Sequence, residues 1–357
     1  MSRKLITIST IMTLMSTSVI ADVPNVAADI APIHSLVSRV MDGVGAPKLI
    51  VQSGASPHGY RLRPSEAKAL QDADHVFWMG EELTPWLDSA IGTLASKASV
   101  TTLLDQQGVI LHDFREGALF EAHDHSAHGD DDHDDHDDHK DHDDHDDHDD
   151  HDDHNDHKDH DDHDDHDDHD DHDDHKDHDD HDDHDDHGSH DPHAWLSPEN
   201  AKLWLNIIAS KLSVSDPENA ATYFMNAAAG QAEIEAMIAE VKATLKPVQG
   251  GKFVVFHDAY QYFENDFDFY ASGAISLADS SDPSPARIEK VQKRIRDEGI
   301  QCVLAEPQFK KGLVATVMEG SDATASVIDP LGAELETGPK LYTRLIKNMA
   351  KTLRNCL

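Results

Sequence analysis

Residues 123–190 repeat the triplet His-Asp-Asp almost without interruption, and this tract limits what the rest of the chain can fold into. The tract holds no large apolar side chain, and most of the chain's formal net charge of -42 is concentrated in it. A like-charged segment of this composition cannot bury a core. We therefore expect the tract to be disordered and the fold to be built from the segments on either side of it.

The tract also predicts an encounter with metal ions. Imidazole and carboxylate groups are both metal ligands, and imidazole favours ions such as zinc, copper and nickel. A flexible chain loses entropy when it binds an ion, so its affinity should be low. Lysines recur in it at regular spacing, which indicates repeat duplication and leaves open a tolerated expansion with no function of its own. The predicted low-affinity ligands include His133, His136, His139, His142, His145, His148, His151 and His154.

The N-terminus has the pattern of a cleavable secretory signal over residues 1–21. Arg3 and Lys4 precede the apolar and small-polar run Leu5–Ile20, and Ala21 fits the small-residue cleavage rule. The alternative is a membrane anchor. No other segment reaches the ~18 consecutive apolar residues that a membrane helix needs. We expect export to the periplasm of a Gram-negative cell.

Short apolar strands alternate with helical patterns on both sides of the tract, which is typical of α/β proteins with parallel sheets. A helical pattern also runs from Ser215 to about Leu245 and stops at Pro247; it is longer than a small domain needs and suits a rigid connector. The predicted strands are Lys48–Gln52, His75–Met79, Val100–Leu104, Phe253–Phe256, Phe269–Leu277, Cys302–Ala305 and Ser326–Ile328.

These elements predict two Rossmann-like lobes, each a parallel-type sheet flanked by helices. The N-terminal lobe would span residues 22–214 and contain the insert 122–191. A connecting helix would span 215–247, and the C-terminal lobe 248–357. Ligands of open α/β sheets bind beyond the carboxyl ends of the strands, so we expect a metal site in the cleft between the lobes.

Four candidate ligands lie at such strand ends or beside the tract. His58 follows the first predicted strand through a short loop, His257 and Asp329 each follow a strand directly, and His193 follows the tract. Three imidazoles with a carboxylate or water complete a tetrahedral zinc site. Glu306 also lies at a strand end, where we expect it to support a ligand or lobe packing rather than to bind metal.

Two cysteines, Cys302 and Cys356, are present. An even pair in an exported protein indicates a disulfide, and the alternative is two unpaired thiols.

Four motifs, in order, resemble the solute-binding proteins of zinc-uptake ABC transporters, the ZnuA type of the metal-binding cluster A-I family. They cover nearly all of the predicted mature chain and flank a charged His-rich insert, as in that family. The cysteine pair is also similar to a disulfide of the family's C-terminal lobe. The motifs are Gly54–His58 with Leu62–Ser65, Asp191–Pro198, Phe256–Phe263 and Asp329–Gly332.

The resemblance implies that His58, His193 and His257 are the three nitrogen ligands of a Zn²⁺ ion. Some zinc-specific members carry Glu directly before the first histidine, where this chain has Pro57. Manganese/zinc relatives use the aspartate that matches Asp329. The fourth position is therefore expected to hold Asp329 or water.

The resemblance also implies a function: a periplasmic protein that captures Zn²⁺ and delivers it to the permease subunit of an inner-membrane ABC transporter. A periplasmic zinc chaperone is a further candidate partner, and we expect a monomer that is not embedded in the membrane. The tract would serve as a zinc buffer or antenna. Alternatives are a manganese/zinc solute-binding protein, a zinc storage or resistance protein, and a zinc hydrolase. The absence of a basic patch argues against nucleic-acid binding.

Overall fold

The computed structural model describes residues 23–115, 120, 190–276, 283–309 and 311–357. The predicted signal and the His/Asp tract lie outside the described residues. The described segments on both sides of the tract belong to one compact unit. Within them, none of the helices combines the length and apolar character that crossing a membrane requires.

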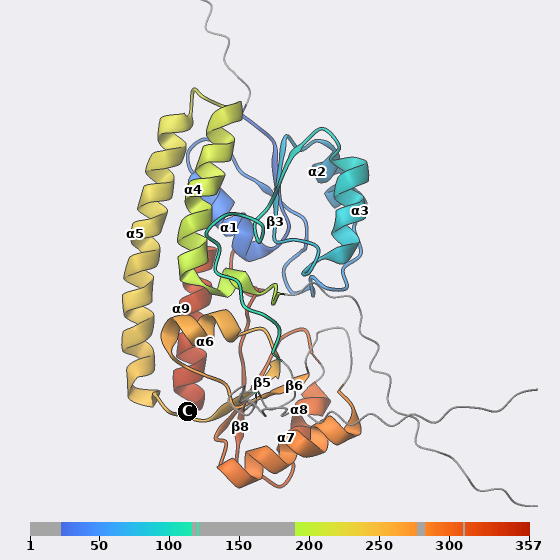
Figure 1. The fold of residues 1–357 in the computed structure, drawn as a ribbon, viewed down its shortest axis with the longest axis vertical. Coiled ribbons are helices and arrows are strands. Elements are labelled where there is room, and N and C mark those ends of the chain that lie inside the picture. The colour runs from blue at the N-terminus through green and yellow to red at the C-terminus, as the bar shows by residue number, and fades with distance from the viewer. Residues whose placement is uncertain (1–22, 116–119, 121–189, 277–282, 310) are drawn as a thin grey trace, which may run out of the picture. The chain divides into compact units, whose positions relative to one another are not determined.

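The first sheet is parallel, with the strand order β2-β1-β3-β4 (Figure 1). Apolar side chains of α2 and α3 pack against one face of it, and α1 belongs to the cluster on the other face. The bounds are β1 Val26–Ala28, α1 Ala31–Val40, β2 Lys48–Leu49, α2 Pro64–Gln71, β3 His75–Trp78, α3 Pro85–Leu94 and β4 Ser99–Thr102.

The second sheet is also parallel and repeats this order as β6-β5-β7-β8. Val291 of α7 and Val314 of α8 pack with Val254 and Val303 on one face. The other face belongs to the larger core that contains α9. The bounds are β5 Phe253–His257, α6 Gln261–Phe267, β6 Ala274–Ser276, α7 Pro285–Glu298, β7 Cys302–Ala305, α8 Lys311–Met318, β8 Thr324–Val327 and α9 Leu341–Cys356.

One long helix, α5, joins the segments that carry the two sheets. It runs from Ala220 to Leu245, 26 residues, or about 39 Å at 1.5 Å per residue. It packs against α4 (Pro198–Ser215), α1 and α9; in Figure 1, α4 and α1 lie beside its upper part and α9 beside its lower part. Gly230 permits a close approach to α4, because a Cβ there would lie 2.9 Å from a Leu205 methyl group. The short 3-10 turns Ala194–Leu196 and Lys246–Val248 complete the order of elements.

The predicted class is confirmed: two parallel sheets flanked by helices, with a long helix between them. Three elements were not predicted from the sequence: β1, which lies inside the first sheet, and the helices α3 and α8. Ser215 was predicted to begin the connecting helix, but it ends α4, and the chain turns at Asp216 before α5 begins. The carboxylate of Asp216 fixes that turn by accepting hydrogen bonds from Asn219 and Tyr223. The lobe boundaries at 214 and 247 remain a prediction.

Candidate metal centre

Three histidines from separate parts of the sequence come together in the fold. His58 lies in the loop after β2, His193 directly precedes the turn Ala194–Leu196, and His257 is the last residue of β5. One ring nitrogen from each can be chosen so that all three lie within 4.8 Å of one another. His193 and His257 are buried and His58 is half-buried. Among the described residues this is the one group of metal-ligating side chains with such spacing, and its members are the three histidines predicted from the sequence.

Buried carboxylates hold two of the three rings. Asp191 Oδ1 lies 2.6 Å from Nδ1 of His193, and Glu306 Oε1 lies 2.5 Å from Nδ1 of His257. A carboxylate at Nδ1 keeps the proton on that nitrogen and leaves the Nε2 lone pair for a metal ion. The two Nε2 atoms lie 3.4 Å apart, so both lone pairs serve the same small volume. Neutral imidazoles arranged in this way are suited to bind a dication.

Glu306 therefore has the supporting role that its position predicted. The corresponding role of Asp191 was missed, although its place two residues before a candidate histidine is a usable signal. The turn that carries His193 is fixed further by Trp195, whose Nε1 donates to the carbonyl oxygen of Pro330 at 2.8 Å. Tyr342 of α9 donates its hydroxyl to the carbonyl of Trp195 at 3.0 Å.

The loop that carries His58 is ordered by side chains of α2 and α3. Trp86 Nε1 donates to the carbonyl oxygen of Pro57 at 2.7 Å. The buried carboxylate of Glu66 accepts from the Tyr60 hydroxyl and from the backbone N–H of Arg63, both at 2.8 Å. These bonds fix the backbone on both sides of His58, which therefore is not presented by an unrestrained loop.

Asp329 is not a member of the three-histidine group. Its Oδ1 accepts the backbone N–H groups of Leu331 and Gly332 at 3.0 and 2.8 Å, and its Oδ2 accepts that of Ala333 at 2.6 Å. These three bonds tie the carboxylate to the backbone of its own loop.

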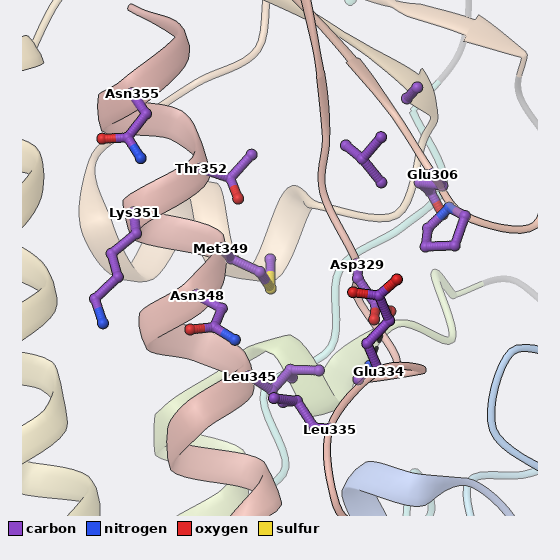
Figure 2. Close-up of a pocket in the computed structure, with 14 residues that line it drawn as sticks. Glu306, Asp329, Glu334, Leu335, Leu345, Asn348, Met349, Lys351, Thr352 and Asn355 are labelled. Atoms are coloured by element: carbon purple, nitrogen blue, oxygen red, sulfur yellow. Dashed lines mark hydrogen bonds between the residues drawn. The ribbon is translucent and has the colours of Figure 1, made fainter. Parts of the chain in front are cut away.

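Asp329 also lines a cavity of about 630 Å³ beside β8 and α9 (Figure 2). Figure 2 shows Asp329 and Glu334 on the loop wall and Asn348, Lys351 and Thr352 along the α9 wall. Glu306, the residue directly after β7 that contacts His257, also lines this cavity.

The predicted disulfide is confirmed. Cys302 and Cys356 are bonded with an S–S distance of 2.01 Å, and they tie β7 to the C-terminal end of α9. Because β7 leads directly to Glu306, the crosslink restrains the strand that supports His257.

Two helix-flanked parallel sheets joined by a long helix, with buried imidazoles from both segments meeting at one point, define the metal-binding class of periplasmic solute-binding proteins. Residues 26–356 match the family described as ZnuA, zinc-uptake complex component A, periplasmic, and the chain belongs to this family. Members of this family are components of a zinc-uptake complex, so the alternative that the chain is a zinc hydrolase is wrong.

Individual relatives agree with this membership. The chain is 47% identical over 332 residues to the high-affinity zinc uptake system protein ZnuA of Brucella abortus (strain 2308), covering 93% of this chain and 91% of that protein. Its fold is similar to a crystal structure of ZnuA, with TM-score 0.65, 19% identity, and coverage of 94% and 99%. It is equally similar to a crystal structure of a zinc-bound ZnuA deletion mutant, with TM-score 0.65, 19% identity, and coverage of 94% and 98%.

Proposed function

We propose that this protein captures Zn²⁺ in the periplasm through His58, His193 and His257 and delivers it to the permease subunit of an ABC transporter. The observation that carries the proposal is the convergence of three imidazole nitrogens within 4.8 Å in a chain of the zinc-uptake family. Three neutral nitrogen ligands favour zinc over harder ions such as manganese, which prefer oxygen ligands.

The fourth ligand in this proposal is water, with Asp329 as the alternative. Water is favoured because Asp329 is not grouped with the three ring nitrogens and its carboxylate is held by three backbone N–H groups of its own loop. A water ligand also makes the zinc ion easier to hand over, because water can leave the ion without any movement of a protein side chain.

The affinity of the site can be separated from that of the tract by experiment. A variant in which residues 122–186 are replaced by a short Gly/Ser linker should bind one zinc ion tightly in a competition titration against a chromogenic chelator. The same variant with His58→Ala and His257→Ala should lose that site. A tight site that disappears with the tract would place zinc capture in the tract and refute the proposal.

The tract is proposed to act as a low-affinity buffer that raises the local zinc concentration. Growth of the source organism in chelator-containing medium should then be slower with the linker variant than with the full chain. Equal growth would favour a tolerated repeat expansion.

Manganese and storage are the competing functions, and metal content separates them from zinc capture. Capture predicts one tightly held zinc per chain after dialysis, whereas storage predicts many. A manganese/zinc protein should hold manganese tightly when zinc is absent, whereas a site of three nitrogen ligands should bind manganese weakly. The permease partner can be tested by zinc transfer from the loaded protein to the reconstituted transporter. A periplasmic chaperone can be tested by zinc transfer from the chaperone to this protein. Light scattering tests whether the protein is a monomer.

A further inference from the structure

Arg115 is a largely buried cation that no part of the metal centre described above explains. Its side chain is 16% exposed and reaches two carboxylates that are almost fully buried, Asp258 and Glu264. Nε lies 3.0 and 3.1 Å from the two oxygens of Asp258, Nη1 lies 2.5 Å from Glu264, and Nη2 contacts both residues. The ring of Phe120 covers the guanidinium at 3.6 Å. A cation held on three sides in this way has one fixed position.

The chain around Arg115 forms a short strap, which we define as residues 112–115 together with 190–191. Asp113 and His190 form an isolated antiparallel bridge, and the backbone N–H of Asp191 donates to the carbonyl of His112 at 2.8 Å. Tyr262 of α6 joins both chains, because its hydroxyl accepts the backbone N–H of His112 and donates to the carbonyl of Asp191. In Figure 1 the segment after β4 runs past the start of α4 to α6.

The strap contacts one buried histidine and the sequence neighbour of the other. Through Asp191 it reaches His193, because the carboxylate of Asp191 accepts from that ring. Through Arg115 it reaches Asp258, the residue that follows His257. We propose that Arg115 is a positioning residue of the zinc site, which fixes His193 and His257 relative to each other by anchoring the strap to Asp258 and Glu264. This inference rests on the proposed zinc-binding function.

The expected loss of zinc affinity depends on how directly a residue holds the histidine ligands. Loss of a group that directly holds a metal-ligating histidine lowers metal affinity roughly 10- to 100-fold. Arg115 acts one residue further out, so its loss should weaken zinc binding by roughly 5- to 20-fold, mainly through faster release. The ligands themselves remain, so binding should not be abolished.

A second arginine in the same chain provides a matched control. Arg39 of α1 is 13% exposed and makes a two-point contact with Glu233 of α5, at 3.0 and 3.1 Å, and neither residue touches the strap or the histidines. Arg115→Gln and Arg39→Gln therefore remove guanidinium groups of similar burial. Glu233 is 50% exposed whereas the partners of Arg115 are buried, so the melting temperatures of the two variants are compared as well. Arg115→Lys keeps the charge but cannot bridge both carboxylates.

The experiment measures zinc affinity, zinc release to excess chelator, and the visible spectrum of the Co²⁺-loaded full-length protein, together with the melting temperature. Support requires weaker binding and an altered Co²⁺ spectrum in Arg115→Gln, an intermediate result in Arg115→Lys, and wild-type values in Arg39→Gln. If Arg115→Gln does not fold, Glu264→Gln removes one of the two anchoring partners and should still weaken zinc binding by roughly two- to fivefold, scaled from the same range.

Three outcomes overturn the inference. Zinc binding in Arg115→Gln (or in Glu264→Gln as its substitute) that equals wild type removes the positioning role and leaves the zinc-binding function intact. Equal losses in Arg115→Gln and Arg39→Gln would reduce the role to general stability. A wild-type protein with no tight zinc site would instead refute the proposed function, and the inference with it.

Discussion

Glu306→Gln should weaken zinc binding without removing a ligand. Glu306 accepts two hydrogen bonds on its two carboxylate oxygens, from Nδ1 of His257 at 2.5 Å and from the side-chain amide of Gln308 at 2.8 Å. Glutamine has nearly the same shape but carries no charge. Its amide oxygen can accept from Nδ1 of His257, and its NH₂ group can donate to the half-buried amide of Gln308 once that amide turns its oxygen toward it. The substitution therefore removes the negative charge beside His257 and keeps the hydrogen bonds.

The magnitude follows from the loss of this charge. A metal ion on Nε2 makes the Nδ1 proton more positive, so the lost carboxylate matters more in the zinc-bound state than in the free protein. Loss of a group that holds a metal-ligating histidine lowers metal affinity roughly 10- to 100-fold, or about 1.4–2.7 kcal/mol.

The assay is a competition titration against a chelator of known affinity, at one pH and ionic strength. Asp297→Asn is the control for the loss of a carboxylate, because Asp297 pairs with Lys293 on α7 at 2.5 Å but is 56% exposed. Exposed pairs of this kind contribute about 0–1 kcal/mol, so zinc affinity should change less than threefold. Wild-type affinity in Glu306→Gln would refute the reasoning, as would an equal loss in Asp297→Asn.

Three further predictions concern single features of the fold. Replacing His58 by Ala should lower zinc affinity by more than roughly 100-fold, because a direct ligand costs more than a supporting group; titration showing wild-type affinity would exclude His58 as a ligand. Replacing Cys302 and Cys356 together by Ala should lower the free energy of unfolding by roughly 4 kcal/mol, from the closure of a loop of 54 residues; urea denaturation would show it as a lower midpoint, and an unchanged midpoint would contradict it. Burial raises the pKa of Asp29 from 3.8 to about 7, so its stabilising contribution is full below pH 4 and is lost as the pH rises through 7; Asp29→Asn should remove on the order of 2–4 kcal/mol of that decline between pH 4.5 and 8 in the metal-free protein, and parallel pH profiles of the two proteins would contradict this.

The sequence predicted the three clustered histidines better than the carboxylates that contact them. Each histidine is a weak signal alone, but three imidazoles beside strand ends and the tract stand out as a set. Glu306 was expected to support a ligand, but its contact with His257 joins residues 49 positions apart and depends on the parallel pairing of β5 with β7. That pairing is tertiary structure, which local patterns do not specify.

The elements that were missed have the same explanation. β1 is three residues long and consists of Val26, Ala27 and Ala28, which is too short to show a period. It is a strand because it pairs on both sides, with β2 and β3. The predicted strand Lys48–Gln52 was longer than the observed one, yet the backbone N–H groups of Ile50 and Val51 still donate to the chain that leaves β1. The apolar pattern of residues 48–52 therefore predicted correctly that this segment pairs with its neighbour, but it did not predict where the regular strand ends.

The register of the two sheets shows why only one of two equivalent strand ends carries a ligand. Val26 pairs with His75 and Phe253 pairs with Cys302, so the first and third strands of the two sheets have the same spacing. In that alignment His257 and Glu306 occupy the positions that Ile30 and Met79 hold in the first sheet.

The first sheet closes its strand ends in another way. The carboxylate of Asp29 accepts the backbone N–H groups of Ile30 and Met79, both at 2.7 Å, so the polar group at this point serves the backbone and is fully buried. The loop after β2 supplies His58 instead. Strand-end position is thus an insufficient signal for a ligand, because the same position can hold a carboxylate that satisfies the backbone or an imidazole of the three-histidine group. The imidazole of His257 lies where a carboxylate, that of Glu306, follows the neighbouring strand, whereas the apolar Met79 holds the matching place in the first sheet and offers an imidazole no acceptor.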